Sequence, residues 1–162
     1  MITKHKSLLL ISVKPEFAEK ILSGEKTMEL RKAAPKKAGK GSVILIYVTT
    51  PIKELWGIGK IEHIIESNPK SLWANHSKKT GITEQEFNMY YGDSTKAFGI
   101  ELTEVKQIFN QSVSLKMLRQ ILPKFSPPQT YAYIEQSDIN FTLIKTLIHS
   151  DSKSTTTKKI LE

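Results

Sequence analysis

The residues with the clearest potential for chemistry lie in the short segment 24–31, which reads Gly-Glu-Lys-Thr-Met-Glu-Leu-Arg. If this segment is a strand, its side chains alternate between two faces, so Glu29 and Arg31 point the same way while Leu30 points into the core. Lys26 stands at the preceding turn, from which it can reach the polar face or the solvent. Three charges of mixed sign at one place form either a structural ion-pair network or a polar cleft that binds a ligand.

In the ligand-binding case, Lys26 and Arg31 would meet a phosphate or the edge of a base. Arg31 suits this role because its planar guanidinium can donate to two acceptors at once. Glu29 can orient the two cations or accept a hydrogen bond from the amino group of a base. If the chain is an enzyme, Lys26 and Glu29 are the residues expected to carry its chemistry.

The octad resembles the signature of the ASCH superfamily, Gly-x-Lys-x-x-Glu-x-Arg, with matches at Gly24, Lys26, Glu29 and Arg31. The likeness extends over roughly residues 8–109, through segments that resemble the strands of the family. It implies an α+β fold, namely a PUA-like mixed β-barrel of five to six strands with peripheral helices. It also implies an association with RNA and points to the bacterial, archaeal and phage branch labelled predicted transcriptional regulators.

Two activities known in the superfamily are alternatives to simple binding. One branch hydrolyses acetylated cytidine with a lysine, a threonine and a glutamate. Lys26 matches that lysine, but Glu29 stands at the threonine position and the third member falls near Lys78, so this amidohydrolase reaction is not expected. Other members are linked to metal-assisted RNA cleavage, for which Glu29, Glu101 and Glu104 are the candidate carboxylates, although their spacing does not require a metal.

The composition restricts the remaining classes of function. The chain has 162 residues and a formal net charge of +8, which favours polyanionic partners through attraction and counterion release. It contains no cysteine, which excludes disulfides and thiolate chemistry and fits a cytoplasmic location. Its four histidines lack metal-ligand spacing, so no metal or other cofactor is expected. No segment approaches the roughly 18 consecutive apolar residues of a membrane helix, so no membrane partner is expected.

The positive charge is concentrated directly after the signature. A run of lysines is often only a solvated loop that aids solubility. Beside a signature associated with RNA, we interpret it as a loop that contacts phosphates. The basic residues of this region are Arg31, Lys32, Lys36, Lys37 and Lys40.

Four further side chains are predicted to contribute to binding. Lys14 leaves the first strand near the signature, and Thr49 ends the central strand, where it is either a cleft wall or a simple turn. Gln129 lies in the proline-rich loop 127–131, which either walls the cleft or clamps the C-terminal helix onto the barrel. Trp56, at the start of a strand, is a candidate platform for base stacking.

The hydrophobic pattern predicts the elements that position these residues. Three strands without an intervening helix between 27 and 65 disfavour a doubly wound α/β sheet. One domain is expected over residues 1–149, followed by a disordered polar tail at 150–162. The pattern predicts strands at 8–13, 27–31, 42–49, 55–65 and 97–109, and helices at 15–23, 69–76, 83–91, 114–122 and 138–149.

Three functions therefore compete. The favoured one is an RNA-binding module, with a possible regulatory role, whose polar cleft holds a nucleotide or a modified base; it predicts salt-dependent binding that leaves the RNA intact. The second is an ASCH-type enzyme acting on RNA or nucleosides, a ribonuclease or an amidohydrolase, whose turnover would require Lys26. The third is a protein-interaction domain, which predicts no affinity for nucleic acid at physiological salt.

Overall fold

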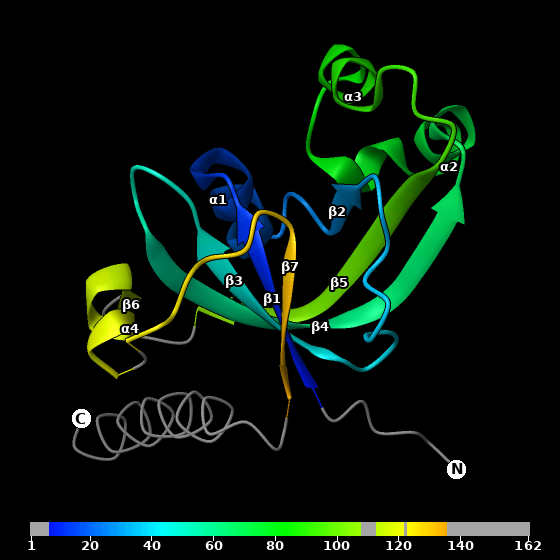
Figure 1. Cartoon of the computed structure of the whole chain (residues 1–162). Helices are drawn as coiled ribbons and strands as arrows, with labels where there is room; N and C mark the ends of the chain where they lie inside the picture. Colours follow the sequence, from blue (N-terminus) through cyan, green and yellow to red (C-terminus); the bar gives the residue numbers. More distant parts are fainter. Residues whose placement is uncertain (1–6, 108–112, 122, 136–162) are drawn as a thin grey trace, which may run out of the picture.

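The computed structural model describes residues 7–107, 113–121 and 123–135 (Figure 1). The predicted last helix at 138–149 and the polar tail at 150–162 lie outside these residues, so the predicted domain boundary between them stays a prediction. The elements, in chain order, are β1 (Ser7–Val13), α1 (Pro15–Ser23), β2 (Met28–Arg31), β3 (Val43–Val48), β4 (Glu54–Ser67), α2 (Pro69–Thr80), α3 (Glu84–Tyr91), β5 (Ala97–Gln107), β6 (Val113–Ser114), α4 (Leu115–Ile121) and β7 (Tyr131–Glu135).

The described strands form one mixed, seven-stranded sheet in the order β2-β5-β4-β3-β1-β7, and β6 pairs with the start of β4. Only β1 and β3 run parallel, while the other pairs are antiparallel. The predicted α+β class is confirmed. The sheet curves strongly, and the long β4 and β5 extend away from β1 to carry α2 and α3 (Figure 1).

The predicted closed barrel is wrong for the described part of the chain. Closure would require the edge strands β2 and β7 to share a ladder of hydrogen bonds, but β2 pairs with β5 and β7 with β1. Side chains bridge the opening instead. The Arg31 guanidinium of β2 lies 5.5 Å from the centre of the Tyr131 ring of β7, and the Tyr131 hydroxyl donates to the carbonyl of Ala33 at 3.0 Å.

Helix α1 forms as its sequence predicts. Pro15 occupies the first turn, and Gly24 ends the helix with a positive φ of 84° that glycine adopts at little cost. Ala18 and Ile21 are buried against the sheet. The sheet accepts the helix closely at Gly57, where an added Cβ atom would lie 2.9 Å from the Leu22 side chain.

Helices α2 and α3 form a hairpin between β4 and β5. Helix α2 is longer than predicted, and the Asn68 side chain caps it by accepting from the Ser71 amide at 2.8 Å. The predicted capping box at the start of α3 is confirmed, with Thr83 and Glu86 bonded reciprocally. Trp73, which the sequence favours as a core residue, packs on the Phe87 ring with a centroid distance of 4.9 Å.

In the C-terminal part of the described chain, the secondary structure differs from the sequence-based prediction at two places. Residue 131, predicted to lie in a rigid loop, begins β7, which pairs antiparallel with β1. Helix α4 is found where predicted, and the Ser114 hydroxyl caps it by accepting from the Met117 amide at 3.1 Å. The short β6 was not predicted, because two residues are too few to show a period.

The core lies on both faces of the sheet, as the largely apolar β3 predicts. Ile44, Ile46 and Val48 pack with β1 and α1 on one face. Leu45 and Tyr47 pack towards α4 on the other. Within the described residues, no helix combines the length and the apolar character needed to cross a membrane.

Candidate functional site

The signature strand β2 has the predicted alternation. Met28 and Leu30 are buried in the core, whereas Glu29 and Arg31 share the opposite face. The polar face is also largely withdrawn from solvent, since the Glu29 and Arg31 side chains are only 9% and 11% exposed. Two charged groups held in this way require close partners, because burying an unpaired charge is costly.

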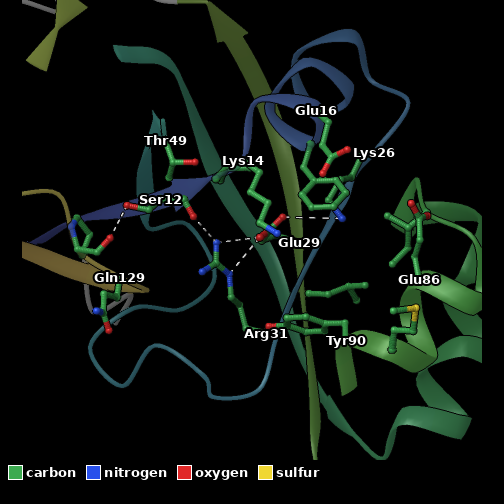
Figure 2. Close-up of a pocket in the computed structure, with 16 residues that line it drawn as sticks. Ser12, Lys14, Glu16, Lys26, Glu29, Arg31, Thr49, Glu86, Tyr90 and Gln129 are labelled. Atoms are coloured by element: carbon green, nitrogen blue, oxygen red, sulfur yellow. Dashed lines mark hydrogen bonds and ion pairs between the residues drawn. The ribbon is translucent and has the colours of Figure 1, made fainter. Parts of the chain in front are cut away.

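Glu29 is the centre of a chain of charged contacts (Figure 2). Its Oε1 accepts a hydrogen bond from Arg31 Nε at 3.1 Å and lies 2.8 Å from Arg31 Nη2, and its Oε2 lies 3.8 Å from Lys26 Nζ. Arg31 Nη2 also donates to the carbonyl of Ser12 at 2.8 Å. The ion-pair network and the polar cleft, which the sequence offered as alternatives, therefore involve the same residues.

Lys26, whose direction the sequence left open, points inward and is 3% exposed. Its Nζ donates to the carbonyl of Thr80 at the end of α2 at 2.8 Å and lies 5.6 Å from the centre of the Phe17 ring. Burial lowers the pKa of Lys26, while the nearby Glu29 carboxylate opposes that shift. Lys26 is thus a withdrawn ammonium that joins the signature to the α2–α3 hairpin.

The hydrogen bonds of Arg31 restrict how it could act as the predicted two-pronged reader of a base. The hydrogen bonds found for its guanidinium use Nε and Nη2, one of the two edges from which an arginine can donate to two acceptors at once. That edge faces Glu29 and Ser12. Only Nη1 takes no part in these bonds, so Arg31 is placed to hold Glu29 and to offer one further donor.

These residues form the floor of a cleft of about 690 Å³ that lies between α1 and α3. Its volume falls within the range of about 300–1,000 Å³ that is typical of small-molecule sites. Three basic and three acidic side chains line it together with apolar and aromatic groups. The lining residues are Ser12, Val13, Lys14, Glu16, Phe17, Lys26, Glu29, Leu30, Arg31, Thr49, Ile82, Glu86, Met89, Tyr90, Pro128 and Gln129.

One wall comes from the junction of β1 and α1. Lys14 and Glu16 are exposed at the mouth, and the Phe17 ring lies beside Lys26. Thr49 and Gln129, whose roles the sequence left open, line the same side and lie across the cleft from Tyr90 (Figure 2). The Ser12 hydroxyl fixes this end by donating to the carbonyl of Pro128 at 2.6 Å.

The opposite wall is helix α3, which the sequence-based analysis did not place in the cleft. Met89 and Tyr90 line the cleft although they are 78% and 40% exposed. Glu86 also lines it, and hydrogen bonds from Thr83 lower the pKa of its exposed carboxyl. In the sequence, two apolar residues stand three and four positions after Glu86 on the helix. This spacing could have indicated that α3 lines the cleft, but it also fits an ordinary surface helix.

Several other predicted residues lie elsewhere. Trp56 is half-buried and donates from Nε1 to Glu54 Oε2 at 2.7 Å, outside the cleft lining. Glu101 pairs with Lys79 at 2.7 Å, and Glu104 with Lys60 at 2.9 Å, so neither joins Glu29 in the cleft. Lys78 is exposed on α2 and does not line the cleft either. Among the described residues, no three His, Cys, Asp or Glu side chains are grouped so as to hold a metal ion.

The lysine-rich segment 32–40 does not line the cleft but begins at its rim. Lys32 Nζ lies 5.3 Å from the centre of the Tyr90 ring. Farther along, Lys37 Nζ lies 3.7 Å from a Glu135 carboxylate oxygen, and Lys40 Nζ lies 3.9 Å from one of Glu62. The lysine-rich segment is therefore attached to the sheet while its ammonium groups stay near the solvent.

Comparisons with known proteins identify the family and the fold. The family model described as "ASCH domain" matches residues 11–109. This chain belongs to the ASCH domain family. The curated relative named "ASCH domain-containing ribonuclease", from Zymomonas mobilis subsp. mobilis, is 31% identical over 129 residues, which cover 80% of this chain and 85% of the relative.

Solved structures support the same assignment. The crystal structure of ASCH from Zymomonas mobilis matches this ASCH domain with a TM-score of 0.79 at 29% identity. The match covers 89% of this chain and 96% of that chain. The N-terminal domain of Staphylothermus marinus McrB has a TM-score of 0.54 at 15% identity, covering 88% of this chain and 93% of that one, and resembles it in fold alone. The resemblance inferred from the signature is confirmed.

Proposed function

We propose that this ASCH domain binds RNA and holds one nucleotide, plain or modified, in the cleft between α1 and α3. The observation that carries the proposal is the composition of the cleft, in which cations and carboxylates face aromatic and apolar side chains within about 690 Å³. The Zymomonas mobilis relative is named a ribonuclease, which supports RNA as the class of ligand. So does the net charge of +8.

The base, the ribose and the phosphate of a nucleotide each have chemically suitable partners in the lining of the cleft. A base can pack between Phe17 and the exposed face of α3, where Tyr90 offers a ring for stacking. Glu16 and Glu86 can accept hydrogen bonds from amino groups of the base or from the 2′-hydroxyl of the ribose. Lys14, exposed at the mouth, is placed to meet a phosphate.

Lys14 provides a direct test, because it lines the cleft and no ion pair joins it to another described residue. We expect Lys14→Gln to weaken the binding of a short RNA oligonucleotide about tenfold, which corresponds to ~1.5 kcal/mol for one charge-assisted hydrogen bond. The matched control is Lys70→Gln, an equal loss of charge at an exposed position on α2 outside the cleft. Equal affinities of the two variants in a fluorescence-anisotropy titration would refute binding in the cleft.

A second candidate function is a ribonuclease, favoured by the relative of that name and by the withdrawn ammonium of Lys26. Cleavage by attack of the 2′-hydroxyl on the adjacent phosphorus requires a group that accepts its proton and a group that protonates the departing 5′-oxygen. Glu29 can serve as the acceptor. Lys26, whose pKa burial lowers, can serve as the donor.

The two candidates are separated by following labelled RNA during the binding experiment. A binding module leaves the RNA intact at every protein concentration. A ribonuclease shortens it, and Lys26→Met then abolishes the cleavage while RNA affinity falls far less. Cleavage that persists unchanged in Lys26→Met would exclude this lysine as the proton donor.

A further inference from the structure

We propose that the exposed face around α4 is a second contact surface for the RNA backbone, reached by the strand as it leaves the cleft. This inference rests on the proposed RNA binding and extends it to a site outside the signature and the lysine-rich segment. We call it the α4 surface. It consists of Lys53, Lys116, Arg119 and Lys124, all of which are exposed.

Backbone contacts bring these residues together from three segments of the chain. The Leu115 amide donates to the carbonyl of Lys53 at 2.8 Å, which joins the turn after β3 to the start of α4. Lys116 and Arg119 are three positions apart on the helix and therefore project from the same side. Arg119 Nε donates to the carbonyl of Phe125 at 3.3 Å, which places Lys124 next to that side.

The α4 surface is more uniformly positive than the lysine-rich segment. No ion pair joins any of its four cations to another described residue, whereas Lys37 and Lys40 each have a carboxylate partner. Residues 49–53, 113–121 and 123–130 contain neither Asp nor Glu. The nearest carboxylate in sequence, Glu54, accepts a hydrogen bond from Trp56 instead. Glu54 is half-buried, whereas the four cations are exposed. A surface whose exposed charges are all positive suits phosphodiesters, which it would contact without reading sequence.

Two short segments of the chain connect the α4 surface to one end of the cleft. Thr49 lines that end, and its carbonyl accepts from the amides of Ile52 and Lys53 at 3.1 and 3.3 Å. Gln129 lines it too, and the segment that carries it runs back to α4 (Figure 1). The lysine-rich segment begins at the other end, beside Tyr90. A strand with one nucleotide in the cleft can therefore be held on both sides.

The test compares short and long RNA on the full chain. Anisotropy titrations of a trinucleotide and a 12-nucleotide single strand are run at several salt concentrations. They are run for wild type, for Lys116→Gln/Lys124→Gln and for the control Lys70→Gln/Lys78→Gln. Both doubles remove two exposed lysines, so their net charges are equal. For the 12-mer, the magnitude of the slope of log K against log salt should fall by about 1.4 in Lys116→Gln/Lys124→Gln, because each of the two lost phosphate contacts contributes ~0.7.

The trinucleotide should bind equally to all three proteins, and the control double should match the wild type with the 12-mer. Circular dichroism melts confirm that the doubles remain folded. If both doubles weaken 12-mer binding alike, net charge alone is responsible and the α4 surface is refuted. If neither does, the inference fails while binding in the cleft stands. If the wild type binds neither RNA, the proposed function fails and takes this inference with it.

Discussion

At the scale of single residues, Glu29 is the group on which the cleft depends. Its carboxylate is largely buried, accepts a hydrogen bond from Arg31 Nε, lies 2.8 Å from Arg31 Nη2 in an ion pair and has a longer contact with Lys26. Breaking a buried pair by removing one partner leaves an uncompensated charge and is strongly destabilising. The sequence-based alternatives for Arg31, a stabilising partner or a reader of bases, therefore make different predictions.

We predict that Arg31→Ala lowers the free energy of unfolding by about 3 kcal/mol, because Glu29 loses its two shortest contacts. Urea unfolding of the variant measures the loss. The double Glu29→Gln/Arg31→Gln should lose less than the sum of its single variants, since no unpaired charge remains. A stable Arg31→Ala protein that binds RNA but no longer discriminates among nucleotides would instead support a direct base contact.

Lys26 gives a prediction about pH. Burial lowers its pKa from the ordinary 10.5, so between the folded-state pKa and 10.5 the unfolded chain binds more protons than the folded one. The contribution of Lys26 to stability therefore rises with pH across that window. The raised pKa of Tyr131 and Tyr91 acts in the opposite sense above about pH 10, so wild type must be compared with a Lys26 variant.

We expect the stability difference between wild type and Lys26→Met to shift in favour of the wild type as pH rises from 7 towards 10. Urea unfolding at each pH measures the difference, in which the tyrosine contributions cancel. An NMR titration of the lysine side chains checks the cause, because Lys26 should lose its proton below the pH at which the exposed lysines do. Titration together with those lysines would contradict the prediction.

At the scale of elements, the α2–α3 hairpin is fastened to the signature by the last carbonyls of α2. The Thr27 amide donates to Lys79 at 2.9 Å, and Lys26 Nζ donates to Thr80 at 2.8 Å. Lys20 Nζ donates to Gly81 at 2.7 Å. These donors satisfy carbonyls that a helix leaves unpaired at its end, and the two ammoniums also suit the negative end of its dipole. The wall of the cleft is thus held in place by the residues of its floor.

Gly81 and Gly24 allow this fastening to be tested. Both end a helix with positive φ, so alanine at either position carries the left-handed cost of ~1–2 kcal/mol. At Gly81 an added Cβ would also lie 2.8 Å from the Cβ of Lys26, whereas nothing lies within 4 Å at Gly24. We predict that Gly81→Ala destabilises the fold by about 1–3 kcal/mol more than Gly24→Ala. Equal losses in urea unfolding would show that the α2–α3 hairpin shifts to accommodate the added Cβ with no loss in the free energy of unfolding.

At the scale of the whole molecule, the net charge of +8 is not spread evenly around the cleft. The cleft itself balances three cations with three carboxylates. Among the described residues, exposed cations gather outside the cleft, in the lysine-rich segment and on the α4 surface. This division suits a ligand whose base or sugar enters a mixed site while its phosphates meet positive surfaces.

We predict that Lys36→Ala/Lys37→Ala weakens binding to all RNA sequences alike and flattens its salt dependence. Phosphate contacts position a strand without specifying its sequence. The exposed Lys37–Glu135 pair contributes little stability, so the double should melt close to the wild type. Titrations with several homopolymer RNAs at a range of salt concentrations measure both effects. A loss confined to one sequence would place these lysines at a base instead.

The local pattern of the sequence determined much of this protein. Alternation along β2 placed Glu29 and Arg31 on one face, proline and glycine set the limits of α1, and the Thr83–Glu86 capping box marked the start of α3. The signature also identified the ASCH domain family. Each of these features depends on neighbouring residues, whose spacing can be read directly from the chain.

Tertiary structure alone decided the rest. The bond from Lys26 to Thr80 joins residues 54 positions apart, and that from Ser12 to Pro128 spans 116 positions. No local period encodes such contacts, so the sequence did not indicate the wall formed by α3, and it left open whether the loop 127–131 walls the cleft or clamps a helix. The closed barrel was an expectation from the family resemblance, and the sequence held no local signal that could correct it. Whether β2 and β7 meet depends on the curvature of the whole sheet, and the Arg31–Tyr131 contact occupies the gap between them.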